Sequence, residues 1–297
     1  MEFEETTPEI VFRSPGRQDC AEAALVLEAV GLRPVVHELE GGWVIVVAPH
    51  RAAEARRELL AWQAENVARP VIPPRQPLAD GRPGILGYAL VMIAVALCVG
   101  NLALGRDWLE AGRIHGAAMF AGQWWRAVTA LTLHADLEHL AANLLFGSVF
   151  GGFAGRYLGS GVAWGLILLA GACGNVINVL VLGAGHRAIG ASTAVFAALG
   201  VLGALGWAGR RGSALGRIYR WGPLIAAVAL LAYTGAGGER RDIGADIWGF
   251  VAGVAAGLLA ARAPAGWLRR GLVQWAAGLG ALAAVGGAWV IALSAGA

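Results

Sequence analysis

The sequence contains no lysine, so all 23 of its basic residues are arginines, and charged residues make up only 14% of its 297 positions. Its three cysteines, Cys20, Cys98 and Cys173, lie far apart, and two of them fall in apolar runs. This spacing indicates neither a disulfide framework nor a cluster of metal ligands. The net charge of +3 is spread over loops, which excludes the basic patch typical of nucleic-acid binding.

Hydrophobic residues, by contrast, are abundant. They make up 57% of the chain, and the mean hydropathy is +0.61. Many of the charges lie in residues 1–82, whereas long stretches after residue 85 carry almost none. The composition therefore predicts a membrane protein with a more polar amino-terminal part.

Residues 1–66 are predicted to form a small soluble α+β domain. Strands are expected at 10–13, 34–38 and 43–47, and helices from Asp19 to about Val30 and from Pro49 to about Gln63. This βαββα order resembles a small ferredoxin-like, signal-transducing type of module. His37 and His50 are expected at its surface, and its ligand is not indicated by the sequence.

Residues 67–84 contain five prolines and are predicted to form a stiff linker. Residues 85–104 are long enough to cross a bilayer. Six further apolar segments follow at about 139–157, 161–183, 191–208, 219–236, 245–262 and 272–295. Arginine-rich loops between the fourth and fifth and between the sixth and seventh spans favour a cytoplasmic amino terminus and an exterior carboxy terminus.

The loop at 105–130 is long and rich in aromatic residues, which suits an element lying at the membrane interface. Three polar features are then expected near the exterior ends of the spans: His139 and Asn143 on one helix face, Ser192 at the start of the fourth span, and Asp246 at the start of the sixth. Polar groups at such depth are costly, so they indicate a functional site. The alternative is that they only hold helices together.

The combination of these motifs resembles the rhomboid intramembrane serine proteases over about residues 85–270. The matching residues, in order, are Trp125-Arg126, His134-x4-His139-x3-Asn143, Gly190-x-Ser192-x3-Phe196 and Gly249-x3-Gly253-x3-Gly257. The resemblance implies a six-helix core, with residues 271–297 as an additional seventh span. It also implies that no metal or cofactor is needed.

Carried over to this chain, the resemblance makes Ser192 the nucleophile, with His139 and Asn143 supporting the oxyanion. Gly190 would allow close approach of the substrate carbonyl. His134, Trp125 and Arg126 would shape the interfacial loop, and the glycine row would let the sixth span lie close to the fourth.

One position departs from the family pattern. The family has a general-base histidine before the glycine row, whereas this chain has Asp246, and no histidine occurs after His186. A serine hydroxyl is a poor nucleophile without a positioned base. Asp246, His186 or His139 could each substitute; His186 is more simply an exposed loop residue beside Arg187.

The sequence therefore predicts an all-α polytopic membrane protein of the bacterial cytoplasmic membrane, with a small cytoplasmic domain. The first function that the sequence predicts is that of an intramembrane serine endopeptidase. Such an enzyme would hydrolyse peptide bonds in or near the transmembrane segments of other proteins in the lipid bilayer. The alternative is a pseudoprotease that binds such segments without cutting them. A third possibility is a signalling protein that acts through the amino-terminal domain.

Overall fold

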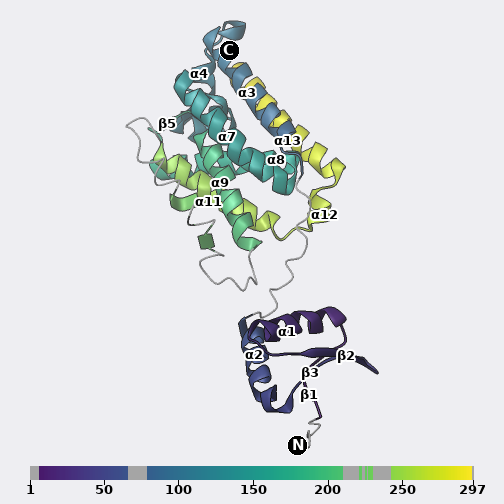
Figure 1. Cartoon of the computed structure of the whole chain (residues 1–297). Coiled ribbons are helices and arrows are strands. Elements are labelled where there is room, and N and C mark those ends of the chain that lie inside the picture. Colours follow the sequence, from purple (N-terminus) through teal and green to yellow (C-terminus); the bar gives the residue numbers. More distant parts are fainter. Residues whose placement is uncertain are drawn as a thin grey trace, which may run out of the picture. The chain divides into compact units, whose positions relative to one another are not determined.

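The computed structural model describes residues 7–65, 79–209 and 242–295, together with residues 221, 222, 225 and 227–229. The chain forms two compact units, Met1–Arg75 and Gln76–Ala297 (Figure 1). Each unit has its own buried apolar core. The first unit contains a small sheet with two helices, and the described part of the second is helical apart from one short strand pair and loops.

The first unit has the predicted βαββα order. Its elements are β1 (Glu9–Ser14), α1 (Arg17–Ala29), β2 (Val35–Leu39), β3 (Gly42–Val47), a 3-10 turn (Pro49–Arg51) and α2 (Ala52–Glu65). The strand order is β1-β3-β2 with antiparallel pairing, and Leu39 opposite Gly42 closes the predicted hairpin. Its core gathers Leu27, Ile45 and Leu59 between helices and sheet.

One helix start in this unit differs from the prediction. Helix α1 begins at Arg17, with Gly16 rather than Asp19 at its cap position. The Asp19 carboxylate instead lies in the first turn and accepts a hydrogen bond from the Ser14 hydroxyl. His37 and His50 are exposed, as predicted.

The second unit contains a helix at each predicted span that falls within the described residues. Its long helices are α3 (Arg82–Gly100), α7 (Leu137–Leu158), α8 (Ser160–Leu182), α9 (Ser192–Ala208), α11 (Ile243–Ala260) and α13 (Gly271–Ala295). In the described part of the chain, α3, α8, α11 and α13 are long and apolar enough to span a membrane, and α9 is apolar but shorter. The predicted span at 219–236 and the arginines at 210–220 lie largely outside the described residues.

The first span begins earlier than predicted. Helix α3 starts at Arg82, inside the stretch expected to be linker, and ends at Gly100 rather than at residue 104. Pro83 explains the early start, because proline lacks an amide hydrogen and its fixed φ suits the first helical turn.

The predicted interfacial segment folds into short elements rather than one. They are a 3-10 turn (Ala103–Gly105), α4 (Trp108–Gly112), β4 (Ile114–His115), α5 (Gly116–Phe120), α6 (Arg126–Thr129) and a second 3-10 turn (Ala130–Thr132). Strand β4 pairs with β5 (Arg187–Ala188), so this segment is tied to the loop before α9. A further short helix, α12 (Ala265–Leu268), connects α11 to α13.

Helix α9 lies at the centre of the second unit, against α7, α8 and α11 (Figure 1). Its contact with α11 is the one expected from the glycine row. A Cβ placed on Gly249 would lie 2.2 Å from the Thr193 carbonyl oxygen, and one on Gly253 would lie 2.1 Å from that of Ala197. The close packing of these two helices is thereby confirmed, and it brings the starts of α9 and α11 together.

Candidate functional site

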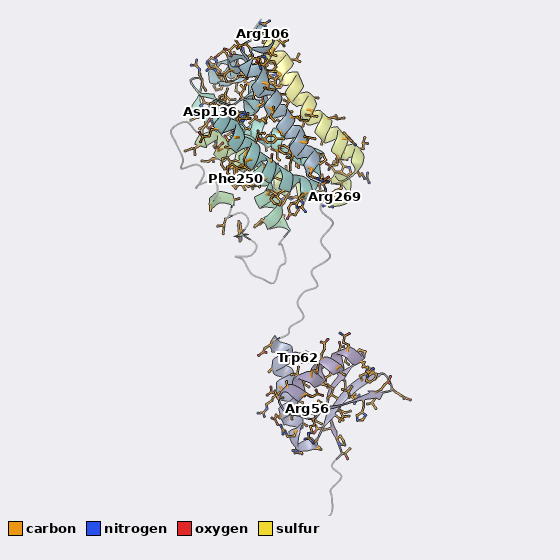
Figure 2. All side chains as sticks on the ribbon, turned by 45° about the horizontal axis from the view of Figure 1, so that its top comes forward. Arg56, Trp62, Arg106, Asp136, Phe250 and Arg269 are labelled. Carbon is orange, nitrogen blue, oxygen red and sulfur yellow. The ribbon has the colours of Figure 1, made fainter. Side chains whose placement is uncertain are left out.

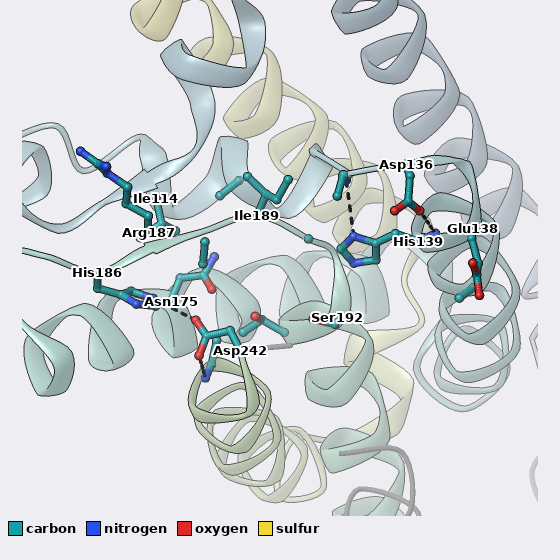
Figure 3. Close-up of a pocket in the computed structure, with 17 residues that line it drawn as sticks. Ile114, Asp136, Glu138, His139, Asn175, His186, Arg187, Ile189, Ser192 and Asp242 are labelled. Carbon is teal, nitrogen blue, oxygen red and sulfur yellow. Dashed lines mark hydrogen bonds and ion pairs between the residues drawn. The ribbon is translucent and has the colours of Figure 1, made fainter. Parts of the chain in front are cut away.

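A cavity of about 960 Å³ lies where several element ends meet. Its wall is formed by the loop before α7 and the first turns of α7, by β5 and the residues after it, and by the starts of α9 and α11. Ser192 faces this cavity between the pair His186 and Asp242 on one side and His139 on the other (Figure 3). Two of the three predicted polar features, His139 and Ser192, therefore border one cavity, and the third stretch contributes Asp242 rather than Asp246.

Ser192 is the first residue of α9 and is partly buried. The backbone just before it turns at Gly190, whose φ of 135° disfavours any residue with a side chain. The Gly190 amide donates to the carbonyl oxygen of Ala130 at 3.0 Å, which fixes the loop on the interfacial segment. Within the described residues, the Ser192 hydroxyl makes no hydrogen bond.

His139 faces Ser192 across Gly190. A Cβ on Gly190 would lie 3.0 Å from His139 Nε2 and 3.7 Å from Ser192 Oγ, so both groups border one small space. His139 Nδ1 accepts a weak hydrogen bond from the Ala135 amide at 3.5 Å. With Nδ1 as the acceptor of this bond, Nε2 is the ring nitrogen nearest Gly190 and Ser192, where it could donate to an oxyanion.

Asp136 sets the position of His139. Its carboxylate caps α7 by accepting from the His139 amide at 2.8 Å. The ring of His134 packs edge-on against that of His139, with 5.1 Å between centroids. Burial, followed by the charge of His139, lowers the pKa of His134 to about 4, so His134 is neutral at pH 7. His134 thus supports His139 and does not face the cavity.

Asn143 lies one turn below His139 and is almost fully buried. Its side-chain amide donates to the His139 backbone carbonyl oxygen at 3.0 Å, and its backbone carbonyl oxygen accepts from the Tyr88 hydroxyl at 2.8 Å. It does not belong to the cavity wall. In this arrangement Asn143 braces α7, and its predicted oxyanion role stays a prediction.

Arg126 organises the interfacial segment. Its Nη1 donates to the carbonyl oxygens of Glu110 at 2.9 Å and Arg113 at 2.8 Å, and its Nε donates to Gln123 at 2.6 Å. Trp125 packs beside Leu133, just before the His134 loop. These contacts agree with the expected role of Trp125 and Arg126 in shaping the interfacial segment.

Asp246 occupies the position of the family histidine, in the first turn of α11. Only 2% of it is exposed, and it is not part of the cavity wall. Helix α11 instead presents Asp242, one turn earlier, to the cavity. The carboxylate expected at the site is therefore buried outside the cavity wall, and Asp242 borders the cavity instead.

Asp242 forms a partly buried polar cluster with His186 and the buried Asn178. Its Oδ2 lies 2.9 Å from His186 Nε2 and accepts from Asn178 Nδ2 at 2.8 Å, while its Oδ1 caps α11 through the Ala245 amide. The His186 side chain is 12% exposed. The expectation of an exposed loop histidine is wrong, because the β4–β5 pairing folds this loop back onto α11.

Asp242 and Asn175 are site residues that the sequence reasoning missed. Asp242 precedes an apolar run by one residue, which is the signature of a helix cap. Asn175 is buried on the cavity wall in the middle of α8 and donates to the Ala127 carbonyl oxygen at 2.9 Å. An amide inside an apolar span is itself a signal that could have identified it.

No group of three His, Cys, Asp or Glu side chains in the described residues is arranged as a metal site would be. The chemistry that the cavity offers is therefore that of a hydroxyl, an imidazole donor and a separate histidine–carboxylate pair.

Comparisons with known proteins identify this region. Residues 121–263 match the model of the rhomboid domain. The chain is 36% identical over 90 residues to rhomboid-like protein 11, chloroplastic, of Arabidopsis thaliana, and 36% identical over 81 residues to rhomboid protease GluP of Bacillus subtilis. These alignments cover 30% and 27% of the present chain, but only 32% and 16% of the two relatives.

Proposed function

Because the chain belongs to the rhomboid family, with the rhomboid domain at residues 121–263, we propose that its cavity receives a transmembrane segment of another membrane protein and holds it without cutting it. The apolar spans make the chain a multi-pass membrane protein, so its clients are embedded in the same bilayer.

The state of Ser192 carries this proposal. Its hydroxyl has no hydrogen-bonded base in the described part of the chain, and Asp246 is buried away from the cavity. A carboxylate is also a weaker base near neutral pH than an imidazole. A serine left without a base loses most of its catalytic rate, by roughly 10⁴-fold or more. Binding in the cavity needs no such activation.

Serine endopeptidase is the second candidate, and one observation favours it. Ser192, Gly190 and the Nε2–H side of His139 are arranged around one space, as an oxyanion site requires. The pair His186 and Asp242 borders the same cavity and is the one described imidazole–carboxylate pair there. If the chain does cut, this pair is the base that we would test first.

We also propose that the cavity opens toward the exterior of a bacterial cytoplasmic membrane. One end of the unit is formed by the start of α3, the end of α7 and the start of α13. Two hydrogen bonds tie these segments together there: the Ala79 amide donates to the Arg156 carbonyl oxygen, and the Arg269 side chain donates to the Tyr157 carbonyl oxygen. Arginines favour the cytoplasmic side. The cavity is built at the opposite ends of α7 and α8, which supports this orientation.

The two candidates are separated by a reactive probe. We expect a fluorophosphonate to leave the reconstituted wild-type chain unlabelled, like its Ser192→Ala variant. Labelling of the wild type that disappears in Ser192→Ala would establish an activated serine and favour the endopeptidase. In that case loss of labelling in His186→Gln, but not in Asp246→Ala, would assign the base to the His186 and Asp242 pair.

Binding is tested directly with a defined client. A photo-crosslinking residue at Ala142, on the cavity wall, should capture a co-reconstituted single-pass model substrate as an intact adduct. The same residue at Leu272, which is 83% exposed on α13, is the control for random collision in the bilayer. Equal capture at the two positions would contradict the binding proposal, and a Ser192-dependent cleaved product would favour the second candidate.

A further inference from the structure

A second cavity, of about 440 Å³, lies between α3, α8 and α13. It shares no residue with the Ser192 cavity. Its inner wall includes Tyr88 stacked on Trp164, with 4.7 Å between ring centroids, and its outer edge includes Leu279 and Leu282, both at least half exposed. The cavity is therefore a groove between three helices that are each apolar enough to span a membrane.

The groove presents an almost wholly apolar surface. Several of its polar side chains are engaged elsewhere: the Ser160 hydroxyl donates to the Asp80 carbonyl oxygen at 3.0 Å, and Gln274 donates to the Leu158 carbonyl oxygen at 2.8 Å. Trp164 Nε1 is buried in the wall and has no hydrogen-bond partner among the described residues. Thr132 donates to the Thr129 carbonyl oxygen at 2.7 Å. Such a lining favours a hydrocarbon occupant, because a polar one would find few partners along it.

The size of the groove decides between the hydrocarbon occupants of a membrane. A spanning helix is about 10 Å across and about 30 Å long, several times the volume available. A single acyl chain is thinner. Glycines contribute to the width: Gly87 and Gly278 border the groove, and a Cβ on Gly87 would meet nothing within 4 Å. The occupant that fits is therefore one lipid chain.

Arginines surround one end of the groove, although the charged side chain that borders the groove itself is the Asp80 carboxylate. The three stretches that meet there, residues 79–84, 155–161 and 268–275, contain the arginines Arg82, Arg156, Arg269 and Arg270 but one carboxylate, Asp80. Asp80 pairs with Arg82 at 2.9 Å, and that hydrogen bond lowers the Asp80 pKa, so the carboxylate is charged. The net charge of this end remains positive. Figure 2 shows Arg269 at the end of the unit opposite to Arg106.

We propose that this groove is a lipid site that takes one acyl chain of an anionic phospholipid, with the phosphate over the arginines at its basic end. Basic pockets between spans are the usual binding place for anionic headgroups. Trp275, which borders the groove and is 71% exposed, is the type of residue found at headgroup depth. The site would couple the seventh span, α13, to the six-helix core through a lipid.

The test uses the full chain, purified in detergent and stripped of lipid. Native mass spectrometry compares dioleoyl phosphatidylglycerol with dioleoyl phosphatidylcholine, which has the same chains and no net charge. We expect one retained adduct with the anionic lipid and at least about fivefold less with the zwitterionic lipid, as the loss of one arginine–phosphate interaction of about 1 kcal/mol would give.

Two variants address the two parts of the site. Gly87→Leu places a side chain into open space, since a Cβ there meets nothing within 4 Å, and should abolish the adduct without harming the fold. Gly280→Leu is its control, because Gly280 is equally open but lies outside the groove. Arg156→Gln should weaken the adduct about fivefold, whereas Arg57→Gln in the first unit should not.

Equal retention of the two lipids would overturn the proposal, as would an adduct that persists in Gly87→Leu or an Arg156→Gln variant that binds like Arg57→Gln. None of these results depends on whether Ser192 is active.

Discussion

At the scale of single residues, His134 shows how burial sets protonation. It lies beside His139 just before α7, and its pKa in the folded protein is lowered to about 4. A histidine in an unfolded chain titrates near 6.5. Between these two values the unfolded chain therefore binds a proton that the folded chain does not.

This difference predicts a pH dependence of stability. As the pH falls from about 6.5 to about 4, the unfolded state takes up a proton that the folded state does not bind. The free energy of unfolding should therefore decrease by at most about 3 kcal/mol over this range. Below about pH 4 this decrease should level off. The unfolding midpoint of the second unit, measured across this range, should lose most of this slope in His134→Gln. His37→Gln, in the first unit, is the control, and an unchanged slope in His134→Gln would refute the prediction.

Asp242 allows a second prediction at this scale. Asp242→Ala removes the cap of α11 and leaves the amide of Asn178, which is 1% exposed, without its carboxylate partner. We expect a loss of about 2–3 kcal/mol in the free energy of unfolding of the second unit. Asp242→Asn keeps an oxygen for the cap and should lose less. Equal losses in the two variants would mean that the cap contributes nothing.

At the scale of elements, the contact between α9 and α11 determines where the site is. Gly253 lies so close to α9 that a Cβ would meet the Ala197 carbonyl oxygen, a backbone atom that cannot rotate away. Gly280 on α13 meets nothing within 4 Å. The same substitution therefore has opposite consequences at the two positions.

We expect Gly253→Ala to lower the stability of the second unit by at least about 2 kcal/mol, because the two helices must separate. Gly280→Ala should be neutral or stabilising by up to about 1 kcal/mol, because alanine favours the helix. Thermal unfolding in detergent gives both values. Similar midpoints for the two variants would contradict the tight contact.

At the scale of the whole molecule, the chain contains two units with separate cores. The first unit packs α1 and α2 against its own sheet and buries Leu27 completely. A segment of residues 1–66 should therefore fold when it is expressed alone.

In that segment, Leu27→Ala should lower the free energy of unfolding by about 3 kcal/mol, since it leaves a cavity in the core. Leu25→Ala on the same helix removes a side chain that is 63% exposed and should cost well under 1 kcal/mol. Denaturant unfolding measures both. If the two variants behave alike, this unit does not have the core described here.

The sequence by itself determined most of the described elements, and of its candidate site residues Ser192, His139 and Gly190 lie on the cavity wall. Apolar runs of membrane length, turn residues in the first unit and the spacing from His139 to Ser192 are local patterns, and the family resemblance followed from them. The glycine row also predicted its own contact, because small residues at every fourth position leave one helix face open.

Only the tertiary structure decided which polar groups face one another. The β4–β5 pairing joins residues more than 70 positions apart and turns His186 inward onto Asp242, while Asp246, one helical turn further along α11, is buried behind the cavity wall. The direction of a side chain depends on the rotation of its helix against its neighbours, and that rotation is fixed by packing between distant segments. No local pattern contains it.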